Sequence, residues 1–287
     1  MNKAIYIGEL ALNVSLCADG HAETGVGDWA VSAAVLDGRM ELPTVWVGEA
    51  AKGTVGDHII KYLQDSKVGT SSVDRFTEGV SPVRVFAGGD TSTTVSHSNY
   101  PADPLNSVWP SINEGDIVIY GSYLMIENRS HARMIDFLKN AKARKAYLVY
   151  LPYFEAHQVP RITRVMPAIF DCLELADLVV GRDADIRAIF ASGNMDAVFK
   201  DHILISCRRF LHLDPAAKVM RFFDGSESWT KQCHPTTNTE FQWSAGALAG
   251  VVRALTEGKR DPDELMEYGN ETAHSELAST IQHPCTK

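Results

Sequence analysis

The sequence lacks a long apolar run, a signal peptide pattern and an excess of basic charge. No stretch approaches the roughly 18 consecutive apolar residues of a transmembrane helix, so we expect no membrane span. The short apolar run at the N-terminus is interrupted by Glu9, which favours a strand and a turn over a signal peptide. A net charge of −9 disfavours nucleic acid or an anionic membrane as the main partner, although it is compatible with a small phosphorylated ligand.

Patterns that would mark a disulfide framework or a metal site are also missing. The five cysteines are scattered, odd in number and contain no CxxC spacing, which predicts reduced thiols and a cytoplasmic location. The ten histidines contain no HExxH and no other paired ligand spacing. We therefore expect core or surface histidines and no zinc centre.

Buried-strand patterns alternate with helical patterns along most of the 287 residues. The expected strands are Lys3–Gly8, Thr44–Val47, Asp116–Tyr120, Ala146–Leu151, Ala176–Val180 and His202–Ser206, and Lys218–Phe223 begins a hairpin. This alternation predicts an α/β fold with a mostly parallel central sheet and helices on both faces. No internal repeat or linker is visible, so we expect one domain over residues 1–287.

A second, smaller β element is expected beside this sheet. Pro82–Val95 alternates apolar with polar residues around Gly88-Gly89, which predicts a hairpin with one exposed face. His21–Gly27 is expected to be a glycine-bearing loop. We interpret the segments near 11–24 and 82–98 as a small β lid. Because exposed sheet edges are usually covered, the lid predicts a homodimer.

The stretch Thr237–Leu255 is a polar loop that runs into a helix of small residues. Ser244 is the expected N-cap. Gly246 and its small neighbours allow the helix start to approach another backbone closely, and the N–H groups of such a helix start can bind an anion. The simpler alternative, a tightly packed helix with an ordinary cap, is favoured by these residues alone.

The order of the N-terminal motifs resembles that of the ribokinase (PfkB-type) carbohydrate kinase family. Asn13 follows the strand end at Gly8 with the spacing of the family's sugar-binding carboxylate, and Glu9 lies beside this position. The sequence TGVGDWAVSAAVLDG resembles the family's glycine-rich loop and helix. It keeps Gly25 and Gly27 and places Trp29 where an Asn contacts the sugar. VGEAAKG followed by LQDSKVGT resembles the next family turn and helix.

The resemblance continues on the side of the family's nucleotide site. Tyr153 falls in the triplet that corresponds to the family's DPN-like turn. The NxxE motif, which the family uses for metal and phosphate, falls on Arg182 and Asp185. Ser206 stands for the Thr that ends the following strand, and Asn270 lies near the residues that contact adenine. The resemblance thus implies nucleotide or phosphate binding by Asp185, Ser206 and Asn270, with Asp185 as the metal-ligand candidate.

The family signature DTxGAGD, followed by a helix with Ala-Gly, corresponds to the stretch 237–255. Asn238 stands where the Asp of Asp-Thr would be, and the resemblance implies phosphate binding by Asn238 and Gly246. Counting forward from Asn238 places the catalytic Asp at Ser244. Counting back from Ala249-Gly250 places it at Ala245. Neither residue is a carboxylate.

Two hypotheses follow for the function. The resemblance implies a ribokinase-like fold and phosphorylation of a sugar or sugar-like hydroxyl with ATP and Mg²⁺, in which Glu240 or Glu9 would replace the usual base. The alternative is a non-catalytic homologue that binds a sugar or a nucleotide, or a protein partner. An unassisted Ser244 hydroxyl is no general base near pH 7, and loss of such a base costs ~10²–10⁴-fold in rate.

Overall fold

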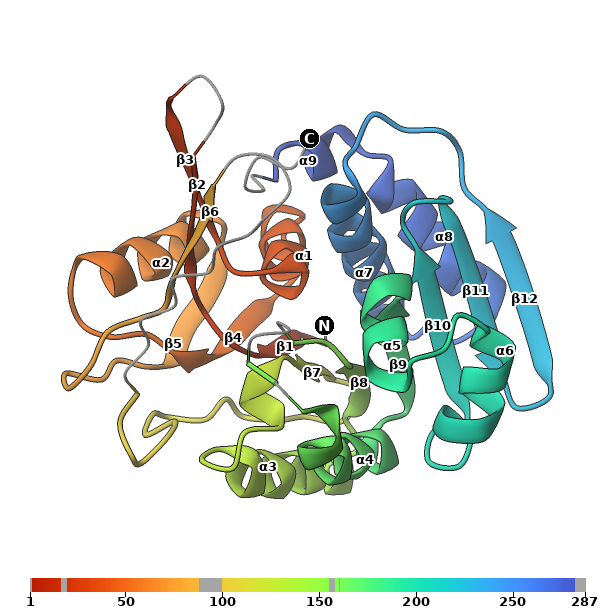
Figure 1. Cartoon of the computed structure of the whole chain (residues 1–287), viewed down its shortest axis with the longest axis horizontal. Coiled ribbons are helices and arrows are strands. Elements are labelled where there is room, and N and C mark those ends of the chain that lie inside the picture. Colours follow the sequence, from red (N-terminus) through yellow and green to blue (C-terminus); the bar gives the residue numbers. More distant parts are fainter. Residues whose placement is uncertain (1, 17–19, 88–99, 155–157, 160, 282–287) are drawn as a thin grey trace.

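The computed structural model describes residues 2–16, 20–87, 100–154, 158–159 and 161–281. Its centre is a nine-stranded sheet in the order β12-β11-β10-β9-β8-β7-β1-β4-β5 (Figure 1). The strands are β1 Ala4–Ile7, β4 Thr44–Glu49, β5 Val68–Asp74, β7 Ile117–Gly121, β8 Tyr147–Leu151, β9 Leu178–Arg182, β10 Arg209–Asp214, β11 Val219–Asp224 and β12 Glu227–Gln232. The seven neighbouring strands β5, β4, β1, β7, β8, β9 and β10 run parallel. Strands β11 and β12 form the expected antiparallel hairpin at the edge.

Helices cover both faces of this sheet (Figure 1). One face packs against α1 Trp29–Arg39, α2 Thr54–Asp65, α7 Glu240–Thr256, α8 Pro262–Ala273 and α9 Glu276–Ser279. The other face packs against α3 His131–Ala143, α4 Met166–Leu175, α5 Asp183–Phe190 and α6 Met195–Val198. Strand β1 is buried throughout, with Ala4 and Tyr6 in one core and Ile5 and Ile7 in the other. The predicted α/β architecture is therefore confirmed.

The described part of the chain also contains three shorter helices. η1 Tyr123–Met125 and η2 Ile162–Arg164 are 3-10 helices, and η3 Phe199–Ile203 is a π-helix. In the part of the chain that the structure describes, no helix is both long enough and apolar enough to cross a bilayer. Cys172, Cys207 and Cys233 are buried free thiols, whereas the other two cysteines lie outside the described residues.

A second sheet leaves the carboxyl end of β1 (Figure 1). Its central strand β2, Leu12–Leu16, pairs antiparallel with β3, Ala22–Val26, and parallel with β6, Val83–Ala87. The first half of the expected hairpin is thus a strand, but its described partner is β2, and residues 88–95 lie outside the described residues. The loop expected at His21–Gly27 is wrong, because most of it is β3.

The strand expected at His202–Ser206 is also wrong. Its first residues belong to η3, and the strand follows later as β10. Ile203 is buried, whereas Ile205 is 79% exposed, so the run has only one face to bury. Phe210, Leu211 and Leu213 in β10 are fully buried on both faces of the sheet, which is the burial that a central parallel strand requires.

The backbones of helices α7 and α8 approach each other closely at two glycines of α7. A Cβ atom added to Gly250 would lie 2.1 Å from the carbonyl oxygen of Tyr268, and one added to Gly246 would lie 2.7 Å from Cα of Ala273. The small residues that the sequence showed in this helix therefore serve helix–helix packing.

We expect Gly250→Ala to lower the free energy of unfolding. Forcing a methyl group into this contact should cost about 1–3 kcal/mol, even though alanine has the better helix propensity by roughly 1 kcal/mol. Urea unfolding would measure the change. Arg253→Ala on the exposed side of the same helix is the control and should stay within about 0.5 kcal/mol of wild type. Equal behaviour of the two variants would contradict the packing argument.

A buried acid in α1 gives a pH-dependent prediction. The Tyr6 hydroxyl donates to Oδ2 of Asp37 at 2.6 Å, and burial raises the pKa of Asp37 more than Tyr6 and Arg253 lower it. The folded chain then keeps a proton that the unfolded chain loses near its ordinary pKa of about 3.9. Stability contributed by this group therefore falls as pH rises through the folded-state pKa.

Asp37→Asn should remove this dependence. In urea unfolding between pH 5 and pH 8, wild type is expected to lose stability relative to Asp37→Asn as pH rises. Asp65→Asn, which alters an exposed carboxyl in α2, is the control and should run parallel to wild type. A constant difference between wild type and Asp37→Asn would show that Asp37 does not titrate differently in the folded chain.

Candidate functional site

The carboxyl ends of the parallel strands meet at one edge of the central sheet, where ligands bind in open α/β sheets. Charged residues follow several of these strands. Glu9 lies two residues after β1, Glu49 ends β4, and Arg182 ends β9. The segments after β7 and β8 add further polar side chains, so this edge is the candidate site.

Glu49 is held by an arginine from the segment after β7. Arg129 donates to the two oxygens of Glu49 at 3.0 and 2.5 Å and to Glu127 at 2.6 Å. The Glu49 side chain is only 2% exposed, and the Arg129 guanidinium lies 4.8 Å from the ring centre of Tyr100. Burial opposes the charge on Arg129, but Glu49 and Glu127 outweigh it and raise its pKa. The guanidinium therefore stays charged beside two carboxylates.

Glu9 lies next to this group and is also buried. Its carboxylate accepts two hydrogen bonds from Nε2 of Gln158, at 3.1 and 2.9 Å, and lies 3.6 Å from Arg84 of β6. Burial raises the pKa of Glu9, and Arg84 and Gln158 only partly oppose this effect. Glu9 thus takes up a proton more readily than an exposed carboxyl does, and it can either accept or donate a hydrogen bond.

A second set of side chains closes the site toward α1. Asp28 caps α1 through Ala30 and Val31, and its other oxygen accepts a hydrogen bond from Tyr153 at 2.5 Å. The Trp29 ring packs edge-on against Tyr153, and the guanidinium of Arg182 lies 5.1 Å from its centre. Trp29 is only 1% exposed, so it fills this space.

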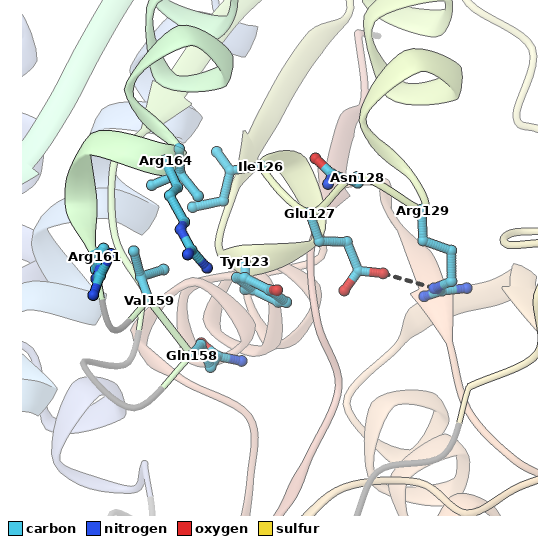
Figure 2. A pocket seen from close by; sticks show the side chains of 10 residues that line it. Tyr123, Ile126, Glu127, Asn128, Arg129, Gln158, Val159, Arg161 and Arg164 are labelled. Atoms are coloured by element: carbon cyan, nitrogen blue, oxygen red, sulfur yellow. Dashed lines mark hydrogen bonds and ion pairs between the residues drawn. The ribbon is translucent and has the colours of Figure 1, made fainter.

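A cavity of about 460 Å³ opens beside Glu127 and Gln158 (Figure 2). One wall comes from the segment after β7 and the other from the segment before α4. The lining residues are Tyr123, Ile126, Glu127, Asn128, Arg129, Gln158, Val159, Arg161, Arg164 and Val165. Glu127 and Arg129 also line a second, narrower cleft with Glu9 and Glu49, which is too small to hold a water molecule. The cavity itself combines an acid, amides and arginines.

The structure brings the four expected sugar-side residues together. Asn13 pairs with Gly25 across β2 and β3, and its Nδ2 donates to the carbonyl of Gly27 at 2.5 Å. Trp29 begins α1 two residues later. Asn13 is 4% exposed, and its bond to Gly27 holds the second sheet onto the start of α1, whereas its Oδ1 has no hydrogen-bond partner among the described residues.

The expected N-cap at Ser244 is wrong. Helix α7 begins at Glu240, and Thr239 is its N-cap in a capping box with Gln242. Thr239 Oγ1 accepts from the Gln242 amide at 3.2 Å, and Gln242 Oε1 accepts from the Thr239 amide at 3.0 Å. Ser244 is fully buried one turn later, where its hydroxyl donates to the carbonyl of Glu240.

The other residues expected around a phosphate make intramolecular contacts. Asn238 is buried and donates to the carbonyl of Ala273 at 2.8 Å, and Gly246 packs on the backbone of the same residue. Asn270 is buried in α8, and within the described part of the chain its Oδ1 has no hydrogen-bond partner. Ser206 lies before β10, at the opposite end of that strand from the site. The structure therefore does not group Ser206 with the other residues.

Asp185 does not fit as a ligand for Mg²⁺ in this arrangement. Both of its carboxylate oxygens accept hydrogen bonds from Arg182, at 2.6 and 3.0 Å. Across the described ranges, no group of three or more acidic, histidine or cysteine side chains is arranged to hold a metal ion.

Several polar residues of the site escaped the sequence reasoning. Glu49 could have been found, because it ends the second buried strand much as Glu9 follows the first. Arg84 alternates with valines in β6 and gave no separate signal. Arg129 and Gln158 come from connecting segments, and only the fold brings them to the carboxyl edge.

Comparison with known proteins supports the fold. No family model and no curated protein matches the sequence. Aminoimidazole riboside kinase from Salmonella enterica has a similar structure, with a TM-score of 0.80 and 11% identity over 98% of this chain and 94% of that chain. An uncharacterized sugar kinase from Pyrococcus horikoshii (TM-score 0.77, 12% identity, 98% and 99%) and fructokinase from Vibrio cholerae (0.75, 13%, 97% and 98%) are also similar.

This chain has the ribokinase-like fold. The expected resemblance is thereby confirmed at the level of the fold, and the low identities are those of a divergent sequence. In this ribokinase-like chain the carboxyl edge has a polar cavity, and the start of α7 is capped by Thr239 and Gln242.

We expect Arg129→Met to destabilise the protein strongly. The substitution leaves Glu49 buried without its cationic partner, which should cost about 3–5 kcal/mol in urea unfolding at pH 7. Lys61→Met, which breaks an exposed ion pair with Asp65 in α2, is the control and should cost at most about 1 kcal/mol. If both variants lose a similarly small amount of stability, Glu49 does not depend on Arg129 as its partner.

Proposed function

We propose that this protein is a carbohydrate-kinase homologue that binds a small polyhydroxylated ligand but has lost efficient phosphoryl transfer from ATP. The observation that carries this proposal is the start of α7. There, the capping box engages the amides of Thr239 and Gln242, and the Asn238 side chain donates to Ala273, so these donors are not free for a phosphate. An anion hole depends on N–H donors that are free and already oriented.

The helix boundary also suggests where the family's base would stand. Two Ala-Gly pairs lie four residues apart in α7, and the count that places the base at Ala245 from the second pair places it at Phe241 from the first. Phe241 is the second residue of α7, which suits a signature that leads into a helix. Neither position holds a carboxylate. A missing general base costs ~10²–10⁴-fold in rate.

The sugar side supports ligand binding. Glu127 can accept hydrogen bonds from hydroxyl groups, and Asn128 and Gln158 add amides beside the same cavity. The cavity volume lies within the roughly 300–1,000 Å³ of ordinary ligand sites. Related folds bind such molecules, as in the Salmonella enterica kinase complexed with aminoimidazole riboside and an ATP analogue and the Vibrio cholerae fructokinase with fructose and ADP.

ATP-dependent phosphorylation with Mg²⁺ is the second candidate function. It is favoured by Glu240, an exposed carboxylate beside Phe241 at the first position of α7. It is also favoured by neighbours of the same fold that bind nucleotides, including the Pyrococcus horikoshii sugar kinase in complex with ATP. In this case Glu240 would accept the hydroxyl proton, and Mg²⁺ would have to bind with the nucleotide, since both oxygens of Asp185 are engaged.

The second sheet completes the proposal. Strands β2 and β6 fall within the two segments expected to form a lid, β3 begins in the first segment and ends two residues beyond it, and β3 and β6 are the edges of the sheet. We propose that this sheet acts as the lid and as the contact of a homodimer. The cytoplasmic location expected from the scattered cysteines stays a prediction.

Calorimetry with Mg²⁺-ATP and a phosphotransfer assay over neutral sugars and nucleosides separate the two candidates. We expect ligand binding by at least one sugar and a turnover far below the 1–10³ s⁻¹ typical of enzymes. Turnover within that range would overturn the proposal. Loss of that turnover in Glu240→Gln, but not in Glu257→Gln at the other end of α7, would then establish Glu240 as the base.

A further inference from the structure

Two arginines in the cavity wall have no role in the network around Glu9 and Glu49. Arg161 and Arg164 line the cavity from the segment before α4, on the side opposite Glu127 (Figure 2). Their guanidinium groups make no hydrogen bond, ion pair or ring contact with the described residues. Arg129 differs from them, because two carboxylates already neutralise it.

We propose that the cavity binds a polyhydroxylated ligand that carries an anionic group, a carboxylate or a phosphate, and that Arg161 and Arg164 recognise this group. This inference rests on the proposed function, since it names the class of ligand for the same site. Guanidinium groups suit both anions, because their N–H donors match pairs of oxygens.

The distribution of charge around the cavity predicts how the ligand is oriented. On the inner side of the cavity, Glu127 lies among the carboxylates of Glu9 and Glu49 around Arg129, so this side disfavours an anion and Glu127 can accept hydrogen bonds from hydroxyl groups. The opposite wall has Arg161 and Arg164. The hydroxyl-bearing end of the ligand should therefore lie toward Glu127 and its acidic end toward Arg161 and Arg164.

The start of α4 adds to the positive potential of this wall. Val165 both lines the cavity and precedes α4, which has ten residues and no side-chain hydrogen bond at its N-cap. The N-terminus of a helix favours negative charge by roughly 0.3–1 kcal/mol at an exposed site. This contribution acts in the same sense as the two arginines.

Calorimetry with matched sugars tests the proposal. The panel is D-glucose, D-gluconate and D-glucose 6-phosphate, with D-ribose and D-ribose 5-phosphate as a second set. We expect at least one acid to bind tenfold or more tightly than its neutral partner. The arm that binds distinguishes a carboxylate from a phosphate ligand, and its affinity should fall as salt is raised.

The double variant Arg161→Gln/Arg164→Gln should abolish this preference, so that an acid binds no more tightly than its neutral partner. Both side chains are exposed, so thermal melting should show a folded protein. Arg208→Gln, which alters another exposed arginine before β10, is the matched control and should keep the preference.

The outcomes separate this inference from the proposed function. If a neutral sugar binds as tightly as its acids, or if the preference survives the double variant, the anionic-ligand inference is wrong and the proposed function stands. If no member of the panel binds at about 10 mM, which is roughly tenfold above the weak end of the usual range of enzyme KM values, both are wrong.

Discussion

The parallel order of the central strands is the constraint on which the site depends. It places the segments after β1, β4, β7 and β8 at one edge, where their charged residues become buried against one another. A buried charge is tolerated only with a partner, and here the partners come from different segments. Arg129 from after β7 holds Glu49 from β4, and Gln158 from after β8 holds Glu9 from after β1. The polar contacts that shape the cavity therefore also bind these segments together.

The fold could be predicted from the sequence wherever a run of apolar residues was buried on both faces. The β1, β7 and β8 runs are of this kind, and each became a central strand. The prediction was wrong at His202–Ser206, because an apolar run of that length also suits a helix with one buried face. Only the packing of Ile203 against the core and the exposure of Ile205 distinguish the two.

The candidate site was predictable in part. Asn13, Gly25, Gly27 and Trp29 lie close together in the sequence, and local pairing of strands brings them together in the fold. The ion pairs of Glu49 and Glu9 join residues dozens of positions apart, and no local pattern marks such pairs. The start of α7 had a readable signal, since Thr239 and Gln242 have the spacing of a capping box. Ser244 and the small residues after it suggested a later helix start.

The start of α7 is also tied to the last described turn of the chain. Besides capping the helix, Gln242 donates through Nε2 to the carbonyls of Ser279 and Ile281, at 2.9 and 3.0 Å. Asn238 likewise reaches Ala273 at the end of α8. During synthesis, these contacts cannot form until residues 279–281 have left the ribosome. The segments that line the cavity, within residues 123–165, are synthesised before these contacts can form.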